Sequence, residues 1–269
     1  MALQASGQIK YSEIIAEFGT PNSGGIGEYR LSENVGSLSN LPLDTGVPQS
    51  GQIKFSDFYS KKLNHVVDLY SIGNNTSRQN AKDRWNNGNV HIVGSTKTGK
   101  TQPPDTIDDR VIVNVNATIR SAKGTQTHCA LRTGTWDSNT TLEIEIGTSG
   151  KLYGSGGDGG AGGSANETPG TDGQTGSSAL GIQYPCTINN LGVIQSGYGG
   201  GGGGGGNTRT TGGGKKGGAT TNGSSGGGGG GGAGLPAGSA GGVSTPLAVG
   251  GGSAGSAGGA GSLSGQATG

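Results

Sequence analysis

One stretch of the chain matches a phosphate-binding motif. Residues 94–101 read GSTKTGKT and fit G-x-x-x-x-G-K-[ST], in which backbone N–H groups and a lysine hold nucleotide phosphates. That chemistry requires a helix whose N-terminus faces the phosphates. Pro103 and Pro104 follow at once and disfavour a helix at that point. We therefore predict a hairpin loop here and no nucleotide site.

Other residues with catalytic potential show no productive spacing. Glu143 and Glu145 lie on one side of an expected strand, where a solvated strand face explains them better than a glycosidase pair. The three histidines share no ligand spacing, and no Ser, His and Asp group into a triad. Cys129 and Cys186 are too few and too isolated for a disulfide framework or a CxxC metal site. The sequence predicts no enzyme, no cofactor and no metal ion.

Composition draws attention to glycine instead. The chain has 269 residues, of which 63 are glycine and 28% are hydrophobic, and its formal net charge is +1. So small an apolar fraction argues against one large core, and the near-neutral charge gives no sign of nucleic-acid binding. The N-terminus lacks the basic and apolar parts of a signal peptide, and no apolar run approaches the length of a membrane span. We expect synthesis in a reducing cytoplasm.

The longest glycine run, residues 197–206, recurs in altered form at 226–234 and 250–261. Ordering one such run costs about 1–2 kcal/mol per residue, and no side chain offsets that cost by burial. Several runs side by side can satisfy one another's backbone groups in the polyproline II conformation, which has 3 residues per turn. We predict packed rods, with a disordered linker as the alternative. Residues 154–163 are the first expected rod, and 164–178 an exposed polar loop.

The first sixty residues hold an internal repeat. Residues 6–13 (SGQIKYSE) are echoed by residues 50–57 (SGQIKFSD). Ser12 and Ser56 each precede an acidic residue, which predicts two short helices with serine N-caps. A segment this small needs another surface, either the next domain or a partner protein. We favour docking onto a partner, through the apolar residues Ile9, Tyr11, Ile53, Phe55 and Phe58.

Between residues 63 and 150 the pattern changes to alternating apolar and polar residues. The stretches 111–119 and 142–146 both alternate in this way, which is typical of strands buried mainly on one face. Turn signals separate them from further expected strands at residues 65–70, 89–93 and 128–132. We predict a small antiparallel β domain in which Trp85 and Trp136 pack in the core or at a sheet edge, with ligand platforms as the alternative.

The repeated N-terminal element resembles a short element common in the virion and tail proteins of tailed bacteriophages. The glycine-rich C-terminus resembles the tail-fibre adhesins of T-even-like phages. In those adhesins, glycine-rich motifs form a bundle of polyglycine II helices, and loops at its tip contact the bacterial receptor. The resemblance implies a non-catalytic tail adhesin in the virion, made in the host cytoplasm. The alternative is a structural virion protein of the baseplate, neck or capsid surface, with the bundle as a rigid spike.

The expected fold class is mostly β and has three parts. A loop and helix docking segment (1–62) precedes the antiparallel β domain (63–150) and the polyglycine II bundle (151–269). The expected partners are another tail or baseplate protein and a bacterial outer-surface receptor, protein or polysaccharide, with neither nucleic acid nor membrane insertion. Because loops on a rigid scaffold commonly carry binding function, the inserts between glycine runs are the candidate receptor contacts. They are Asn207, Arg209, Thr210, Lys215, Lys216, Leu235, Val243, Leu247 and Val249.

Overall fold

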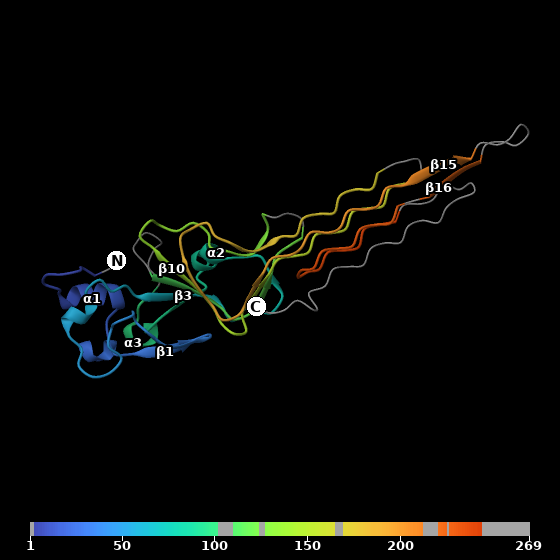
Figure 1. Cartoon of the computed structure of the whole chain (residues 1–269). Coiled ribbons are helices and arrows are strands. Elements are labelled where there is room, and N and C mark those ends of the chain that lie inside the picture. Colours follow the sequence, from blue (N-terminus) through green and yellow to red (C-terminus); the bar gives the residue numbers. More distant parts are fainter. Residues whose placement is uncertain are drawn as a thin grey trace, which may run out of the picture.

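The molecule is elongated, with a sheet-rich body that carries a narrow projection (Figure 1). The structure is a computed structural model, and it describes residues 3–101, 110–123, 127–164, 169–211, 220–224 and 226–243. The N-terminal elements lie at the end of the body away from the projection (Figure 1).

The body is a parallel β-solenoid, because the chain visits the same sheets in the same order on successive turns. The sheets have the strand orders β13-β10-β7-β3-β6, β14-β11-β8-β4 and β12-β9-β5. The early turns comprise β3 (Asn64–Leu69), β4 (Thr76–Ser77) and β5 (Gln79–Asn80), then β7 (Arg110–Val115), β8 (Thr118–Arg120) and β9 (Cys129–Arg132). The later turns comprise β10 (Thr141–Ile146), β11 (Lys151–Tyr153) and β12 (Ser178–Gly181), then β13 (Thr187–Asn190) and β14 (Val193–Gln195).

This topology confirms a mostly β fold and corrects its predicted antiparallel pairing. Within the described solenoid the strand pairs are parallel, apart from the pairing of β3 with β6 (Val90–Ile92). Alternation identifies which face of a strand is buried, but it does not encode the direction of the neighbouring strand. The stretch 111–119 also proves to be two strands, β7 and β8, because the chain leaves one sheet for the next at Asn116 and Ala117.

The solenoid interior is filled by residues that stack in register from turn to turn. Val67, Val113 and Ile144 occupy equivalent positions on β3, β7 and β10, and all three are fully buried. Trp85, on α2 (Ala81–Asn86), and Trp136 belong to the same core, with ring centroids 5.6 Å apart. The prediction that both tryptophans pack in the core or at a sheet edge is therefore confirmed, and the core is where they lie.

The outer face of the five-stranded sheet is covered by the N-terminal residues. Ile112 on β7 belongs to a second buried cluster with Ile14 and Phe18, and the Asn114 amide donates to the Val35 carbonyl at 2.7 Å. β7 is therefore buried on both faces, not mainly on one. The covering elements are α1 (Tyr11–Phe18), η1 (Ile26–Tyr29), β1 (Ser32–Val35), β2 (Leu38–Pro42) and η2 (Phe55–Phe58). Helix α3 (Ser95–Thr98), from later in the chain, packs beside the end of α1, with Thr98 next to Gly19.

The two copies of the N-terminal repeat start their helices in the same way. The Lys10 N–H donates to the Glu13 carboxylate, and the Lys54 N–H donates to the Asp57 carboxylate, each at 2.7 Å. Lysine is the N-cap residue in both, so the predicted serine caps are wrong. The acidic residue three positions on reaches back to the cap N–H, and this half of a capping box fixes both helix starts.

Candidate functional site

The phosphate-loop match does not form the geometry that its chemistry requires. The short helix α3 begins after Gly94 and ends before Lys100, whereas a phosphate loop needs the helix to open at that lysine. The Gly94 N–H donates to the Glu33 carboxylate, and the Lys100 ammonium donates to the Ala16 carbonyl. The segment is one turn of helix, which corrects the predicted hairpin loop.

Glu143 and Glu145 of β10 form hydrogen bonds to neighbouring strands of the sheet. Arg110 donates to Glu143 at 2.7 Å, and Asn189 donates to Glu145 at 2.5 Å, so each carboxylate joins neighbouring strands. Within the described ranges, no three His, Cys, Asp or Glu side chains are grouped as metal ligands would be. No helix of the described residues has the length and apolar character needed to cross a membrane.

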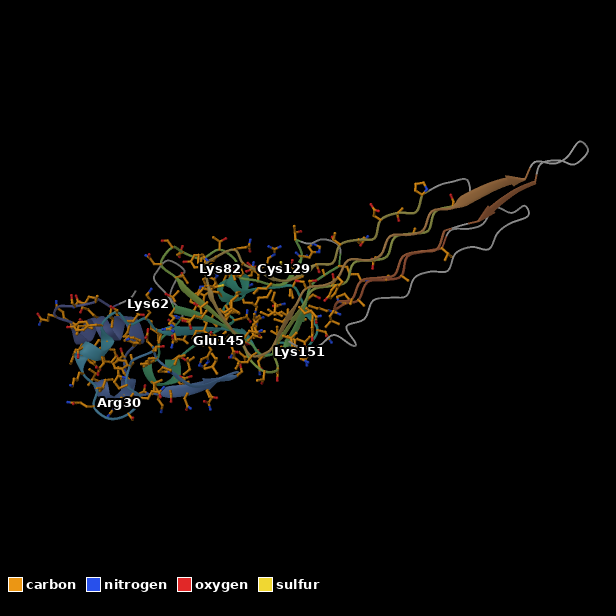
Figure 2. The ribbon with its side chains drawn as sticks, viewed as in Figure 1. Arg30, Lys62, Lys82, Cys129, Glu145 and Lys151 are labelled. Carbon is orange, nitrogen blue, oxygen red and sulfur yellow. The ribbon has the colours of Figure 1, made fainter. Side chains whose placement is uncertain are left out.

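The projection consists of glycine-rich segments that run side by side (Figure 1). Side chains crowd the body and are sparse along the described part of the projection (Figure 2). The first, third and fifth segments lead away from the body, and the second and fourth return to it. In chain order they are the first (154–163), second (169–177), third (197–206), fourth (226–234) and fifth (236–243) segments.

The first segment is bonded to all the others. Its Gly157 and Gly160 N–H groups donate to Tyr198 and Gly201 of the third segment, both at 2.8 Å. The N–H groups that donate to any one neighbouring segment are three residues apart. The backbone therefore completes one turn every three residues, so that every third N–H points in the same direction. The first segment also donates to the fifth segment, through Gly156, Gly159 and Gly162. It accepts bonds from the fourth segment, donated by Gly226, Gly229 and Gly232. It accepts bonds from the second segment as well, donated by Thr171, Gln174 and Ser177.

This close approach leaves no room for side chains at the inward positions. A Cβ at Gly160 would lie 1.9 Å from the Thr171 carbonyl oxygen, and one at Gly156 would lie 1.8 Å from the Gly232 carbonyl oxygen. Real Cβ atoms essentially never come within 3.0 Å of such an atom. Side chains are therefore confined to the remaining third position, where this segment carries Ser155, Asp158 and Ala161.

The second segment belongs to this bundle, which corrects the prediction of an exposed loop over 164–178. Its glycines at 170, 173 and 176 face the third segment, where an added Cβ would lie 2.1–2.3 Å from a carbonyl oxygen. The intervening residues are polar and exposed or half-buried, and they dominate the composition that predicts a loop. The missed signal is the spacing of the glycines, one at every third position.

The bundle continues the register of the sheet from which it emerges. β11 and β14 are parallel neighbours, with Tyr153 opposite Gln195. Immediately afterwards the Gly154 N–H donates to the Gln195 carbonyl at 2.7 Å, and Gly157 donates to Tyr198 with the same sequence offset. The strands of the solenoid thus set the alignment of the first and third segments.

A buried serine cluster lies where the sheets give way to the bundle. Ser121, Ser155 and Ser177 are each at most 2% exposed. The Ser155 N–H donates to the Ser121 hydroxyl at 2.8 Å and to the Ser177 hydroxyl at 2.9 Å. The hydroxyl groups of Ser121 and Ser177 thus accept from a backbone N–H, and the three serines hydrogen-bond to one another, as buried polar groups require.

An ion pair ties the body to the bundle. The Asp158 carboxylate accepts from the Lys123 ammonium at 2.9 Å and from the Ser239 N–H at 2.6 Å. Lys123 also donates to the Ser239 hydroxyl at 2.9 Å, so one lysine contacts the first and fifth segments. The hydrogen bond from Lys123, followed by that from Ser239, lowers the pKa of the Asp158 carboxyl.

We expect this ion pair to make the bundle acid-sensitive. A lowered folded-state pKa stabilises the fold above the unfolded pKa, and that stabilisation is lost as the pH falls through the folded value. Both side chains are one-third exposed, so the contribution is about 1 kcal/mol or less. Asp158→Asn should lower the melting temperature at pH 7 but not at about pH 2. Asp172→Asn, on the exposed side of the second segment, is the control, and equal effects of both changes would contradict the assignment.

The far end of the projection is a β-hairpin. β15 (Asn207–Thr211) continues the third segment, and β16 (Thr220–Ser224) leads into the fourth. The strands are antiparallel, with Thr211 opposite Thr220, and they lie far from the body (Figure 1). The hairpin carries the candidate residues Asn207, Arg209 and Thr210 on β15. The candidates Lys215, Lys216, Leu247 and Val249 lie outside the described residues.

The two remaining candidates lie at opposite ends of the bundle. Val243 is 49% exposed and follows Gly242, whose carbonyl accepts from Gly162 near the outer end of the first segment. The Leu235 N–H donates to the Gly154 carbonyl at 2.8 Å, where the first segment leaves the body. The structure thus places Val243 toward the hairpin end and Leu235 at the base.

The predicted docking residues differ in accessibility. Ile9 and Phe58 are 8% and 0% exposed and belong to the cluster beneath the N-terminal segment. Tyr11 and Ile53 are half-buried, and Phe55 is 43% exposed. Phe55 packs edge-on against Tyr11, with ring centroids 6.3 Å apart. The predicted docking residues with solvent-accessible side chains are therefore Phe55, Tyr11 and Ile53.

Taken together, these elements define a protein that holds a hairpin away from a β-solenoid body on a bundle of hydrogen-bonded glycine segments. The family model described as phage tail fibre adhesin Gp38 matches residues 82–269, which is more than half of the chain. The chain belongs to this family of phage tail fibre adhesins. No curated protein and no solved structure matches it.

Proposed function

We propose that the chain binds a bacterial surface receptor through the outer end of its glycine bundle. Membership of the tail fibre adhesin family supports a receptor-binding role on the phage tail without catalysis. The observation that carries the proposal is the hairpin of β15 and β16, which lies at the end of the projection farthest from the body (Figure 1). A surface in that position meets a bacterium before the body does.

The glycine segments are proposed to be polyglycine II helices. Polyproline II geometry has 3 residues per turn and no internal hydrogen bonds, so every N–H and C=O points outward. The period of three in the bonds between segments supports this geometry. Such a bundle supplies stiffness without a hydrophobic core, because each bond to a neighbour contributes about 0.5–1.5 kcal/mol net. A stiff support holds the binding loops at low entropic cost.

The proposed contact residues are those placed at or beyond the outer end. They include Asn207, Arg209 and Thr210 on β15, together with Val243. Lys215 and Lys216 connect β15 to β16 in the sequence and remain candidates, as do Leu247 and Val249. Cationic side chains suit anionic sugars or acidic loops of a surface protein. Leu235 lies at the base and has no part in this surface.

The opposite end of the molecule is proposed to attach to another tail or baseplate protein. The first 62 residues cover the solenoid face away from the projection, which is the geometry an adhesin needs if its other end is to reach the host (Figure 1). Among the described residues of this segment, Phe55 is the most exposed large apolar one, and it lies beside Tyr11. These two rings are the proposed centre of the attachment surface.

An adsorption competition tests the receptor proposal. Purified protein should compete with phage for intact host bacteria, and the triple variant Asn207→Ala, Arg209→Ala, Thr210→Ala should compete at least about tenfold less well, since loss of one charge-assisted contact alone costs about 1.5–3 kcal/mol. Lys151→Ala, on the solenoid surface, should compete normally. A triple variant that folds and competes as well as the unaltered protein would place the receptor site elsewhere.

A further inference from the structure

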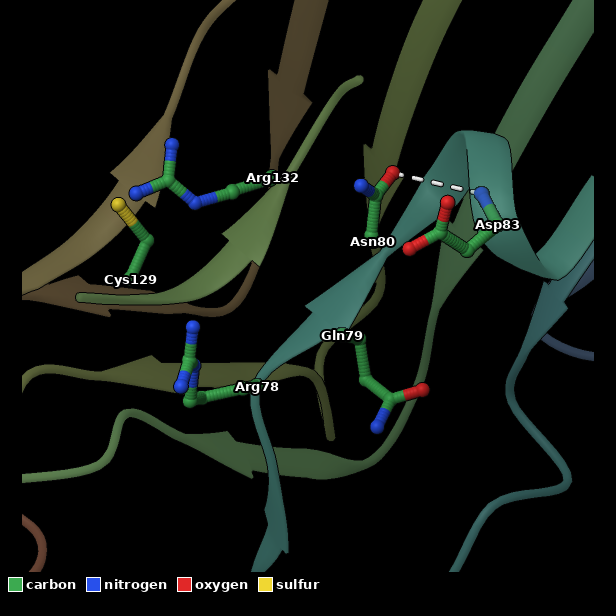
Figure 3. Close-up of a pocket in the computed structure, with 6 residues that line it drawn as sticks. All are labelled: Arg78, Gln79, Asn80, Asp83, Cys129 and Arg132. Carbon is green, nitrogen blue, oxygen red and sulfur yellow. Dashed lines mark hydrogen bonds between the residues drawn. The ribbon is translucent and has the colours of Figure 1, made fainter. Parts of the chain in front are cut away.

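A polar pocket opens on the side of the solenoid, away from the hairpin. It encloses about 360 Å³, which is within the range of small-molecule sites. Strand β5, the start of α2 and strand β9 supply most of its walls, and Arg78, at the corner between β4 and β5, completes them. The lining residues are Arg78, Gln79, Asn80, Asp83, Cys129 and Arg132 (Figure 3).

Arg78 is held in an uncommon backbone conformation at the pocket's edge. Its φ is +42°, in the left-handed region that side chains other than glycine rarely adopt. The flanking pairs, Ser77 with Arg120 and Gln79 with Leu131, belong to different sheets, so Arg78 turns the corner between them. Such strain persists where the surrounding structure imposes it, and it is common at binding sites. The Arg78 side chain is exposed at this corner.

The charges in the pocket are separated. The guanidinium groups of Arg78 and Arg132 lie on the side of Cys129, and the Asp83 carboxylate lies on the other side, next to Asn80 (Figure 3). One end of the pocket therefore favours an anion, and the other offers an acceptor for hydroxyl groups.

The side-chain amides of Asn80 and Gln79 each have one polar group in a hydrogen bond within the protein and the other available to a ligand. The Asn80 carbonyl oxygen accepts from the Lys82 and Asp83 N–H groups at the start of α2, which leaves its NH₂ as a donor. The Gln79 NH₂ donates to the Ser77 carbonyl at 2.9 Å, which leaves its oxygen as an acceptor. The pocket thus presents donors and acceptors in the mixture that vicinal hydroxyl groups require.

We propose that this pocket binds an anionic saccharide, with the acid group between Arg78 and Arg132 and the ring hydroxyls toward Asn80, Gln79 and Asp83. A guanidinium group suits a carboxylate or phosphate because two of its N–H groups match two oxygen atoms of the anion. A neutral sugar would leave both positive charges in the pocket without an anion, although the Arg132 guanidinium already donates to the Thr127 carbonyl. A bare anion would leave the amides and the carboxylate without a bound hydroxyl group. This site is additional to the one proposed at the hairpin and does not depend on it.

A titration of the full chain by protein-observed NMR tests the proposal. The probes are a galacturonate disaccharide for the carboxylate, glucose 6-phosphate for the phosphate, and glucose as the neutral counterpart. At least one acidic probe should bind, and glucose should bind at least about tenfold more weakly than that probe. The Arg78→Gln substitution should lower the affinity for the acidic probe about 10–100-fold, as expected for the loss of a charged hydrogen bond. Lys151→Gln removes the same charge from a distant surface and should leave the affinity unchanged.

Cys129 provides a second measurement that needs no arginine variant. In a Cys186→Ser background, the bound acidic sugar should slow alkylation of Cys129, whose sulfur lines the pocket. Absence of binding by both acidic probes, equal binding of glucose, or full binding by a folded Arg78→Gln protein would overturn the proposal. The hairpin triple variant should keep its sugar binding, which separates failure of this site from failure of the receptor site.

Discussion

Alanine at position 203 is expected to split the glycine bundle. A Cβ there would lie 1.9 Å from the Ala161 carbonyl oxygen and 2.4 Å from its carbon, both backbone atoms. The third segment must move at least about 1 Å outward before this distance reaches even 3.0 Å, below which real Cβ atoms essentially never come. Its bonds from Gly160 and Gly163, now 2.8 and 2.7 Å long, would then break. Overpacking typically costs about 1–3 kcal/mol, and a clash with backbone should reach the upper end of that range.

The neighbouring glycine provides a matched control. A Cβ at Gly202 would lie 3.8 Å from the nearest atom, the Thr171 carbonyl oxygen, and the backbone there is not in the left-handed region. Gly202→Ala should be neutral or stabilise the bundle by about 0.4–1 kcal/mol, because it reduces the entropy of the unfolded chain. Thermal unfolding and amide exchange of Gly201 and Gly204 would measure both variants. Equal destabilisation by Gly203→Ala and Gly202→Ala would refute the threefold packing.

Stability of the body should fall steeply in mild acid because of His65. This residue, on β3, is 1% exposed, and neither ring nitrogen has a hydrogen-bond partner of good geometry in the described structure. Burial lowers its pKa to about 4, and its ring packs edge-on against Trp85 with centroids 5.2 Å apart. An unfolded histidine has a pKa of about 6.5, so between these values only the unfolded state takes up the proton. Unfolding therefore becomes easier by roughly 3 kcal/mol as the pH falls from about 7 to 4.

Replacement by phenylalanine should remove this dependence. His65→Phe keeps an aromatic ring against Trp85 and deletes both buried nitrogens, so it should be at least as stable as the unaltered protein at pH 4.5. Urea unfolding at pH 7 and pH 4.5 gives the two free energies. His128→Gln, at a half-buried position where the ring Nδ1 lies 3.1 Å from the Lys123 carbonyl oxygen, is the control and should keep the acid sensitivity. A slope that persists unchanged in His65→Phe would assign the effect to other groups.

The apolar and polar pattern of the sequence located the longer strands but did not predict how they pair. The alternation over 142–146 corresponds to β10, and the apolar runs near residues 65 and 129 correspond to β3 and β9. Their parallel stacking could not be predicted, because the first turn of the solenoid is completed by β4 and β5, which have two residues each. Two-residue strands carry no periodicity, and without them the chain reads as separate hairpins.

The receptor candidates show the same limit. The sequence predicts that inserts between glycine runs are exposed, and Asn207 and Val243 do lie toward the outer end. It does not say which way each run travels, so it groups Leu235 with them although the fourth segment has returned to the base by that point. The polar pocket has no sequence signal, because only the pairing of β5 with β9 brings Arg78 and Arg132 to the same pocket.

The threefold repeat of the bonds between segments has a consequence for how far such an adhesin extends. If three residues were added to each segment of the bundle, every contact between segments would be kept and the projection would lengthen by about 9 Å. One or two added residues would turn side chains into their neighbours. Reach can therefore change only in whole steps, while the solenoid beneath and the hairpin above stay as they are.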